Sequence, residues 1–221
     1  MSASRQPAVC LLSGGLDSVV AAALWLEAGH EIALCLTFAY QQRASARECE
    51  AAERFARSRG LPWRAIPLDW LGELAARSGS ALTAAGGDLP RASVAAPGDA
   101  ESAKAVWVPA RNAVFTSVAV AHAEAMELDV VLAGFNREEA VTFADNSQAF
   151  VDAGNAFFAL GTRRAVRLES PTQALDKVEI VAAARRLGVE REALWSCYRG
   201  DEEPCGRCES CARSARAWGS A

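Results

Sequence analysis

The stretch SGGLDS at residues 13–18 places two glycines, two hydroxyls and a carboxylate directly after the apolar run AVCLL. Glycines let the backbone approach an anion closely, and successive N–H groups at the start of a helix form a natural anion site. The stretch lacks both the G-x-x-x-x-G-K-[ST] and the G-x-G-x-x-G spacing. It therefore predicts a phosphate-binding turn, with a plain structural turn as the alternative.

Four of the seven cysteines lie in the last 25 residues with the spacing C-x7-C-x2-C-x2-C, at Cys197, Cys205, Cys208 and Cys211. Four thiolates fill a tetrahedral Zn²⁺ shell, so this spacing predicts one structural zinc per chain. An iron–sulfur cluster also takes four thiolates and is the main alternative. Redox-active thiols are a weaker one, because two overlapping C-x2-C pairs with a fourth thiol indicate a cage. The odd cysteine count argues against a disulfide framework.

Hydrophobic periodicity predicts alternating strands and helices, as in a parallel sheet with helical crossovers. The strands are expected at 8–12, 31–38, 61–69, 129–134 and 164–169, and the helices at 18–28, 44–59, 112–127, 146–160 and 176–187. Gly29 is expected at the end of the first helix, Asp145 or Asn146 at the N-terminus of the fourth, and Asp176 at that of the fifth. A short helix is expected to follow the cysteines. The turn at 13–18 then lies at the carboxyl end of the first strand, where parallel sheets bind ligands.

Composition excludes several classes of protein. The 221 residues are half apolar and carry a net charge of −4, which argues against a nucleic-acid partner. No stretch is long and apolar enough to span a membrane, and the N-terminus does not resemble a signal peptide, so a cytoplasmic protein is expected.

Residues 78–106 are rich in Gly, Ala, Ser and Pro and are expected to form a long mobile loop that acts as a lid. Only Lys104 and Lys177 among the 23 basic residues are lysines, which favours a specific role for a lysine.

SGGLDS resembles the S-G-G-x-D-S signature of the PP-loop ATP pyrophosphatases, which adenylate a substrate oxygen and release pyrophosphate. Five motifs in order narrow the resemblance to the 7-cyano-7-deazaguanine synthase family over nearly the whole chain. After SGGLDS these are T-F-x-Y-x-Q-R at 37–43, V-P-x-R-N at 108–112, D-K-x-E-I at 176–180, and C-Y with C-G-x-C-x-x-C at 197–211. The resemblance implies a doubly wound, mostly parallel α/β sheet of the adenine nucleotide alpha hydrolase type. The PP-loop domain is expected at 1–190 and a zinc-bearing subdomain at 191–221.

The resemblance also implies the roles of single residues. Asp17 would place Mg²⁺ or polarise the loop, and Lys177 and Arg111 would stabilise charge on the transferred phosphates. Arg43 is a weaker candidate, with sheet-edge packing as its other role. The pyrophosphate end of ATP would contact residues 12–18, namely Leu12, Ser13, Gly14, Gly15, Leu16, Asp17 and Ser18.

The family converts 7-carboxy-7-deazaguanine and ammonia to the nitrile with two ATP, so these small molecules are the expected partners, together with a second copy in a homodimer. With only His30 and His122 the chain has no visible glutaminase triad, so ammonia would come from solution or from a partner. Residues 134–147 depart from the family pattern, although Asp145 and Ser147 cover some of the same ground. A related ligase with a different acceptor, or a zinc-stabilised nucleotide-binding module without catalysis, are therefore the alternatives.

Overall fold

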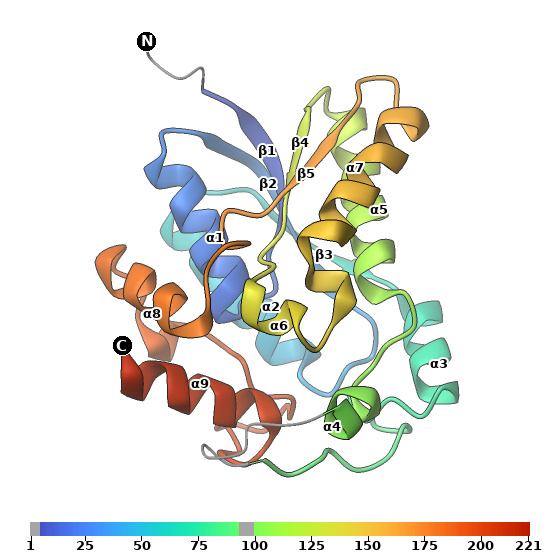
Figure 1. Ribbon diagram of the computed structural model, residues 1–221, viewed down its shortest axis with the longest axis vertical. Coiled ribbons are helices and arrows are strands. Elements are labelled where there is room, and N and C mark those ends of the chain that lie inside the picture. Colours follow the sequence, from blue (N-terminus) through green and yellow to red (C-terminus); the bar gives the residue numbers. More distant parts are fainter. Residues whose placement is uncertain (1–4, 93–99) are drawn as a thin grey trace.

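The computed structural model describes residues 5–92 and 100–221. Its centre is a parallel sheet in the order β3-β2-β1-β4-β5 (Figure 1). The strands are β1 (Pro7–Leu11), β2 (Glu31–Ala39), β3 (Trp63–Pro67), β4 (Val130–Leu132) and β5 (Arg167–Glu169). The strand order reverses between β1 and β4, so the turn after β1 lies where an open α/β sheet binds its ligand. The predicted doubly wound parallel sheet is confirmed.

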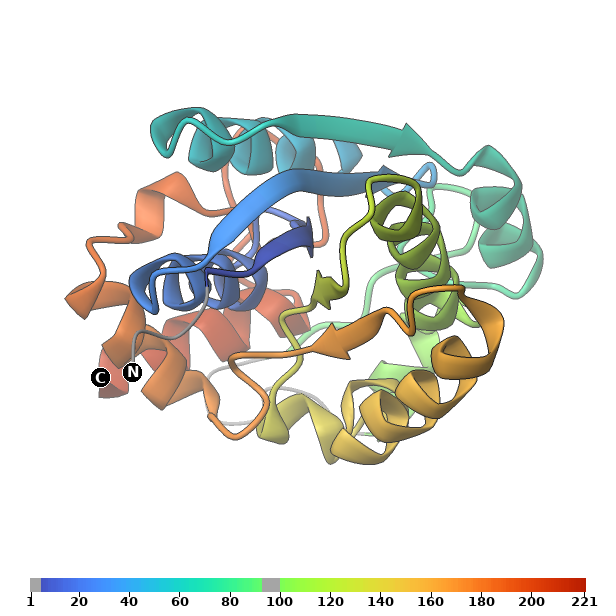
Figure 2. The same cartoon turned by 90° about the horizontal axis from the view of Figure 1, so that it is seen from above.

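Helices cover both faces of this sheet (Figures 1 and 2). One core layer contains α1 (Leu16–Glu27), α2 (Ser45–Ser58), α8 (Lys177–Arg186) and α9 (Glu209–Ser220), and the other contains α3 (Asp69–Arg77), α5 (Arg111–Ala125) and α7 (Gln148–Gly161). Successive strand residues point to opposite layers: Ala8 and Cys10 pack in the first and Val9 in the second. Burial on both faces explains why β1 is apolar throughout rather than alternating.

Helix boundaries agree with the sequence prediction to within a few residues, with one correction at α7. The expected cap at Asp145 or Asn146 is wrong, because both residues lie in a 3-10 turn, η1 (Ala144–Asn146). Ser147 caps α7 instead, and its Oγ accepts a hydrogen bond from the backbone N–H of Phe150. Asp176 caps α8 as predicted, in a capping box with Glu179. Ala28 closes α1, and Gly29 follows it with a φ of 85°.

The segment 78–106 is more structured than predicted. It ends in a short helix, α4 (Ala100–Ala105), and Ser80, Leu82 and Leu89 are buried. Arg43 holds the start of the segment by donating from Nε to the Ala81 carbonyl at 3.0 Å and from Nη2 to the Gly87 carbonyl at 2.6 Å. Arg43 is therefore a structural residue here. The predicted loop is confirmed for residues 78–92, which contain no helix or strand, whereas the helix at 100–105 was not predicted. Residues 93–99 lie outside the described part, and the role of the segment as a mobile lid stays a prediction.

Three further elements were not predicted: α3, α6 (Arg137–Ala140) and η2 (Arg191–Ala193). The C-terminal helix was expected after the cysteines, but α9 begins at Glu209 and contains Cys211. Ala217 in α9 packs in the same core layer as α1 and α8, so the helix that contains Cys211 is joined to the sheet domain by a shared core. The division at residue 190 stays a prediction. None of the described helices has the length and apolarity needed to cross a membrane.

Candidate active site and metal centre

The turn after β1 leads into the N-terminus of α1, which has no side-chain cap. Gly14 has a φ of 76°, and a Cβ on it would meet the Glu48 carbonyl oxygen and the Ala52 nitrogen of α2 at 2.7 Å, so only glycine fits. The Ser13 and Ser18 hydroxyls lie 3.0 Å apart across the turn. Gly15 caps α1 without a side-chain acceptor, which leaves the positive end of the helix available to an anion. This turn, residues 12–18, is called the phosphate loop below.

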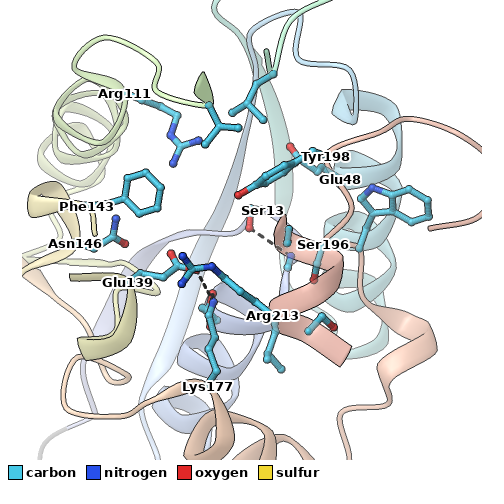
Figure 3. A pocket seen from close by; sticks show the side chains of 18 residues that line it. Ser13, Glu48, Arg111, Glu139, Phe143, Asn146, Lys177, Ser196, Tyr198 and Arg213 are labelled. Atoms are coloured by element: carbon cyan, nitrogen blue, oxygen red, sulfur yellow. Dashed lines mark hydrogen bonds and ion pairs between the residues drawn. The ribbon is translucent and has the colours of Figure 1, made fainter. Parts of the chain in front are cut away.

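Two adjoining cavities open on the phosphate loop. The sheet-end chamber lies over the carboxyl ends of the strands and has apolar walls that include Phe38, Phe115 and Phe135. The polar chamber lies toward the C-terminal segment and includes Lys177, Tyr198 and Arg213 (Figure 3). Seven residues line both chambers and mark their junction: Ser13, Gly15, Asp17, Glu48, Arg111, Glu139 and Asn146. Of the predicted loop residues, only Gly14 lines neither chamber, because it packs against α2.

Lys177 lies between two carboxylates at this junction. Its Nζ is 2.5 Å from Asp17 Oδ2 and 2.6 Å from Glu139 Oε1, and its side chain is only 9% exposed. Burial acts to lower the pKa of Lys177, but Asp17 and Glu139 outweigh it and raise that pKa, so the ammonium stays charged. Burial raises the pKa of Asp17, Lys177 opposes it, and the result is about 6. Asp17 Oδ1 is buried without a hydrogen-bond partner among the described residues.

The sequence prediction missed Glu138 and Glu139. They lie in α6, where the buried Asn136 accepts a hydrogen bond from the Glu139 backbone N–H. Gly134 lets this segment lie on α1, because a Cβ there would meet the Ser18 nitrogen at 2.6 Å. Asn136 followed by Glu139 is the pattern of a helix start, and that pattern directly after a strand end was the available signal.

Arg111 lines both chambers from the start of α5. Burial acts to lower its pKa, but the Tyr40 hydroxyl and the Asp145 carboxylate outweigh it and raise that pKa. Asp145 is thus a neighbour of the site, whereas Ser147 is a helix cap. The predicted residues Asp17, Arg111 and Lys177 all line the polar chamber, and Asp17 and Arg111 also line the sheet-end chamber.

The four cysteines of the C-terminal motif converge. The sulfurs of Cys197, Cys205, Cys208 and Cys211 all lie within 4.8 Å of one another. The backbone N–H groups of Arg199 and Cys205 point to Cys197 Sγ at 3.3 and 3.4 Å, which stabilises negative charge on that sulfur. Hydrogen bonds from Cys197 and Cys211 lower the pKa of Cys208 to about 3. Hydrogen bonds with Cys197 and Cys208 raise the pKa of Cys211 in turn, so the four thiols share their protons unevenly. Four sulfur ligands that converge in this way fit a structural metal ion.

The cysteine segment, residues 195–214, also lines the polar chamber, which the sequence prediction missed. Tyr198 follows the first cysteine, and Ser210, Arg213 and Ser214 lie on one face of α9. Arg213 donates from Nε and Nη2 to Glu209 Oε1 at 3.0 and 2.6 Å, and Glu209 is 1% exposed. The backbone N–H of Trp195 bonds the Gly14 carbonyl at 3.0 Å, which ties this segment to the phosphate loop.

Comparisons with known proteins agree with this geometry. A sequence model of the family described as "Queuosine biosynthesis protein QueC" matches residues 7–221. The chain is 46% identical over 213 residues to a 7-cyano-7-deazaguanine synthase of Pelotomaculum thermopropionicum, with 95% of each chain covered. It is 45% identical over 218 residues to one of Methanothermobacter thermautotrophicus, with 96% of this chain and 93% of the relative covered. The solved NMN synthetase of Francisella tularensis superposes with a TM-score of 0.53 at 16% identity, over 87% of this chain and 66% of that one, which shows a shared fold alone.

Proposed function

The chain belongs to the QueC family of queuosine biosynthesis proteins. On this basis we propose which substrate of a 7-cyano-7-deazaguanine synthase binds in each of its two chambers. The relatives are 7-cyano-7-deazaguanine synthases, and the family resemblance implies the ATP-dependent formation of 7-cyano-7-deazaguanine from the 7-carboxy compound and ammonia. Departure from the family pattern at 134–147 had suggested a different acceptor, but near-full-length similarity to synthases favours the nitrile-forming reaction.

The chemistry needs two activations of the same carbon. First, a carboxylate oxygen of the acid attacks the α-phosphorus of ATP and pyrophosphate leaves, which gives an acyl adenylate. Ammonia then attacks the acyl carbon, the C–O bond to AMP breaks, and the amide forms. The amide oxygen attacks a second ATP in the same way, and loss of AMP and protons leaves the nitrile. Each activation places the α-phosphorus beside the acid, so both substrates must meet at one point.

We assign ATP to the sheet-end chamber and the deazaguanine acid to the polar chamber. The aromatic walls of Phe38 and Phe115 suit an adenine ring, and the phosphate loop at the junction suits the phosphates. The hydroxyls and cations of the polar chamber suit a planar carboxylate. The observation that carries this assignment is the junction itself, where Lys177 is fixed between Asp17 and Glu139 beside the loop shared by both chambers.

Lys177 and Arg111 are the proposed cations that stabilise charge developing on the α-phosphate and pyrophosphate. Asp17 and Glu139 are the proposed Mg²⁺ ligands, and the unpartnered Asp17 Oδ1 fits that role. Bound Mg²⁺ would neutralise phosphate charge. The four cysteines would hold one structural Zn²⁺ that fixes the polar chamber's wall. We further propose a homodimer in the cytoplasm, which size-exclusion chromatography with light scattering tests for the oligomer.

The deciding experiment mixes the protein with Mg·ATP, an ammonium salt and 7-carboxy-7-deazaguanine. Mass spectrometry is expected to detect AMP, pyrophosphate and the nitrile, with two AMP formed per nitrile. AMP without nitrile would favour a ligase with another amine acceptor. If AMP is absent under all these conditions, the chain is a nucleotide-binding module and the proposed assignment is wrong.

A further inference from the structure

The nitrogen that enters this reaction must lose every hydrogen it carries. It arrives as ammonia with three N–H bonds and leaves as a nitrile with none. On the proposed function, a proton acceptor that faces this nitrogen through both activations is therefore required. It must lie at the junction of the chambers, where the acid's carboxyl carbon meets the α-phosphorus.

Three carboxylates line that junction, and two of them are already engaged. Asp17 and Glu139 each form an ion pair with Lys177. Both are also the proposed Mg²⁺ ligands, so their oxygens are committed to cations rather than to the reacting nitrogen. Glu48 is the third, and no salt bridge to it is found among the described residues.

Glu48 is positioned beside the phosphate loop by the start of α2. Its backbone carbonyl packs on Gly14, and its side chain lines both chambers. Gln42 Nε2 donates to Glu48 Oε2 at 2.8 Å, and Gln42 is itself fixed by its bonds to Tyr40 and Phe38. Figure 3 labels Glu48 among the side chains that line the polar chamber. Unlike the two proposed Mg²⁺ ligands, Glu48 forms no salt bridge with Lys177.

Two other roles for Glu48 fit this position less well. Recognition of the amino-pyrimidine edge of the deazaguanine would need a carboxylate far from the acid's reacting carbon, whereas Glu48 lies at the junction of the chambers. Burial raises the pKa of Glu48, while the Gln42 hydrogen bond and the charge of Arg111 lower it less. A higher pKa makes a carboxylate a better base at neutral pH.

We propose that Glu48 is the general base that accepts protons from the reacting nitrogen. In the first cycle the ammonia lone pair forms the C–N bond, the acyl C–O bond breaks, and its electron pair leaves with AMP. The nitrogen then carries a positive charge, and one N–H proton passes to a Glu48 carboxylate oxygen. In the second cycle the adenylated amide loses its two remaining N–H protons, and the C–O bond to AMP breaks as C≡N forms. Glu48 returns each proton to water between steps.

The test separates adenylation from nitrogen chemistry. Acid-dependent exchange of labelled pyrophosphate into ATP reports adenylation without ammonia. In Glu48→Gln we expect this exchange to stay within about twofold of the wild type. Formation of amide from acid, and of nitrile from supplied amide, should each fall about 100-fold or more, the usual contribution of a general base. Glu50→Gln is the matched control, because Glu50 lies on the same helix, is exposed and forms a salt bridge with Arg47 away from the chambers.

If Glu48→Gln is poorly folded, as judged by zinc content and thermal unfolding, Glu48→Asp is the second variant that tests the proposal. It keeps a carboxylate but withdraws it by one methylene, and we expect about a tenfold loss of amide formation with exchange preserved. The proposal is overturned if either variant loses exchange and amide formation in parallel, or if Glu48→Gln forms nitrile at the wild-type rate. Failure of the wild type to make nitrile would instead overturn the proposed function.

Discussion

The phosphate loop and the cysteine segment both line the polar chamber, but they obtain their shapes differently. The loop is one contiguous turn in which Gly14 and the Ser13–Ser18 hydroxyl pair set the backbone. The cysteine segment has few regular hydrogen bonds before α9 and is gathered by four sulfurs from positions up to 14 residues apart. The first region is determined by local backbone geometry, and the second by the convergence of four cysteine sulfurs. The two should therefore respond differently to mutation.

Metal removal should have the largest effect and should act on the cysteine segment. In Cys208→Ser, or after chelation, we expect a loss of stability that is a sizeable part of the ~10 kcal/mol typical of structural Zn²⁺ binding. Nitrile formation should disappear, while ATP binding weakens less than tenfold because the loop is built without the metal. Thermal unfolding and ATP titration measure both. Cys49→Ser, which lies outside the cluster, is the control.

The metal itself distinguishes zinc from the iron–sulfur alternative. We expect one equivalent of zinc by elemental analysis and a colourless protein. Iron with visible absorbance would contradict the zinc assignment and with it the purely structural view of this segment.

Lys177→Met should have the next largest effect and should act on the phosphate loop. Loss of the fixed cation is expected to slow acid-dependent pyrophosphate exchange about 10²–10³-fold. It also leaves two carboxylates facing each other, at a cost of about 3 kcal/mol. Exchange assays and urea unfolding measure these effects, with the exposed Lys104→Met as control. An exchange rate within threefold of the wild type would contradict the proposed catalytic role of Lys177.

The pH dependence of kcat/KM for ATP should report the titration of Asp17. Its pKa of about 6 means that the carboxylate is lost as the pH falls through 6, so kcat/KM for ATP should drop about tenfold per unit below that value. The contribution of Asp17 to the free energy of unfolding has the opposite pH dependence. Because the pKa of Asp17 in the folded protein lies above the ordinary 3.8, this contribution is fully present below pH 3.8 and is lost as the pH rises through 6. Asp17→Asn should be slow throughout and lack this limb of the profile. A wild-type profile that is flat from pH 5 to 7 would contradict the assignment.

Arg213→Lys should have the smallest effect and should act on the cysteine segment's chamber face. Lysine cannot reproduce the two-point contact with Glu209, so the cation should shift, and KM for the deazaguanine acid should rise about tenfold. KM for ATP should stay unchanged, because Arg213 does not line the sheet-end chamber. Steady-state kinetics for both substrates decide this. Arg207→Lys, an exposed arginine two residues before Glu209, should behave as the wild type.

Most of the parallel sheet and the main helices could be predicted from sequence. Apolar runs such as AVCLL indicate buried strands, and their periodicity is a local property. Helix α3 and the ordered part of 78–106 could not be predicted from sequence. Their burial depends on tertiary contacts, such as those from Arg43 to the Ala81 and Gly87 carbonyls. The α7 cap was misplaced for the same kind of reason, since three adjacent polar residues could each have capped it.

The sequence by itself was enough to predict the phosphate loop, the four proposed metal ligands and the proposed cations Arg111 and Lys177, because each belongs to a short motif with its own chemistry. Only the tertiary structure decided that Glu139 and Asp17 share Lys177 and that Arg213 lines the chamber with Tyr198. It also decided that Glu48 lies at the junction without an ion pair to any residue that the structure describes. These contacts join residues far apart along the chain. A carboxylate becomes a metal ligand, a counter-ion or a base according to which charges surround it, and spacing along a sequence does not specify those neighbours.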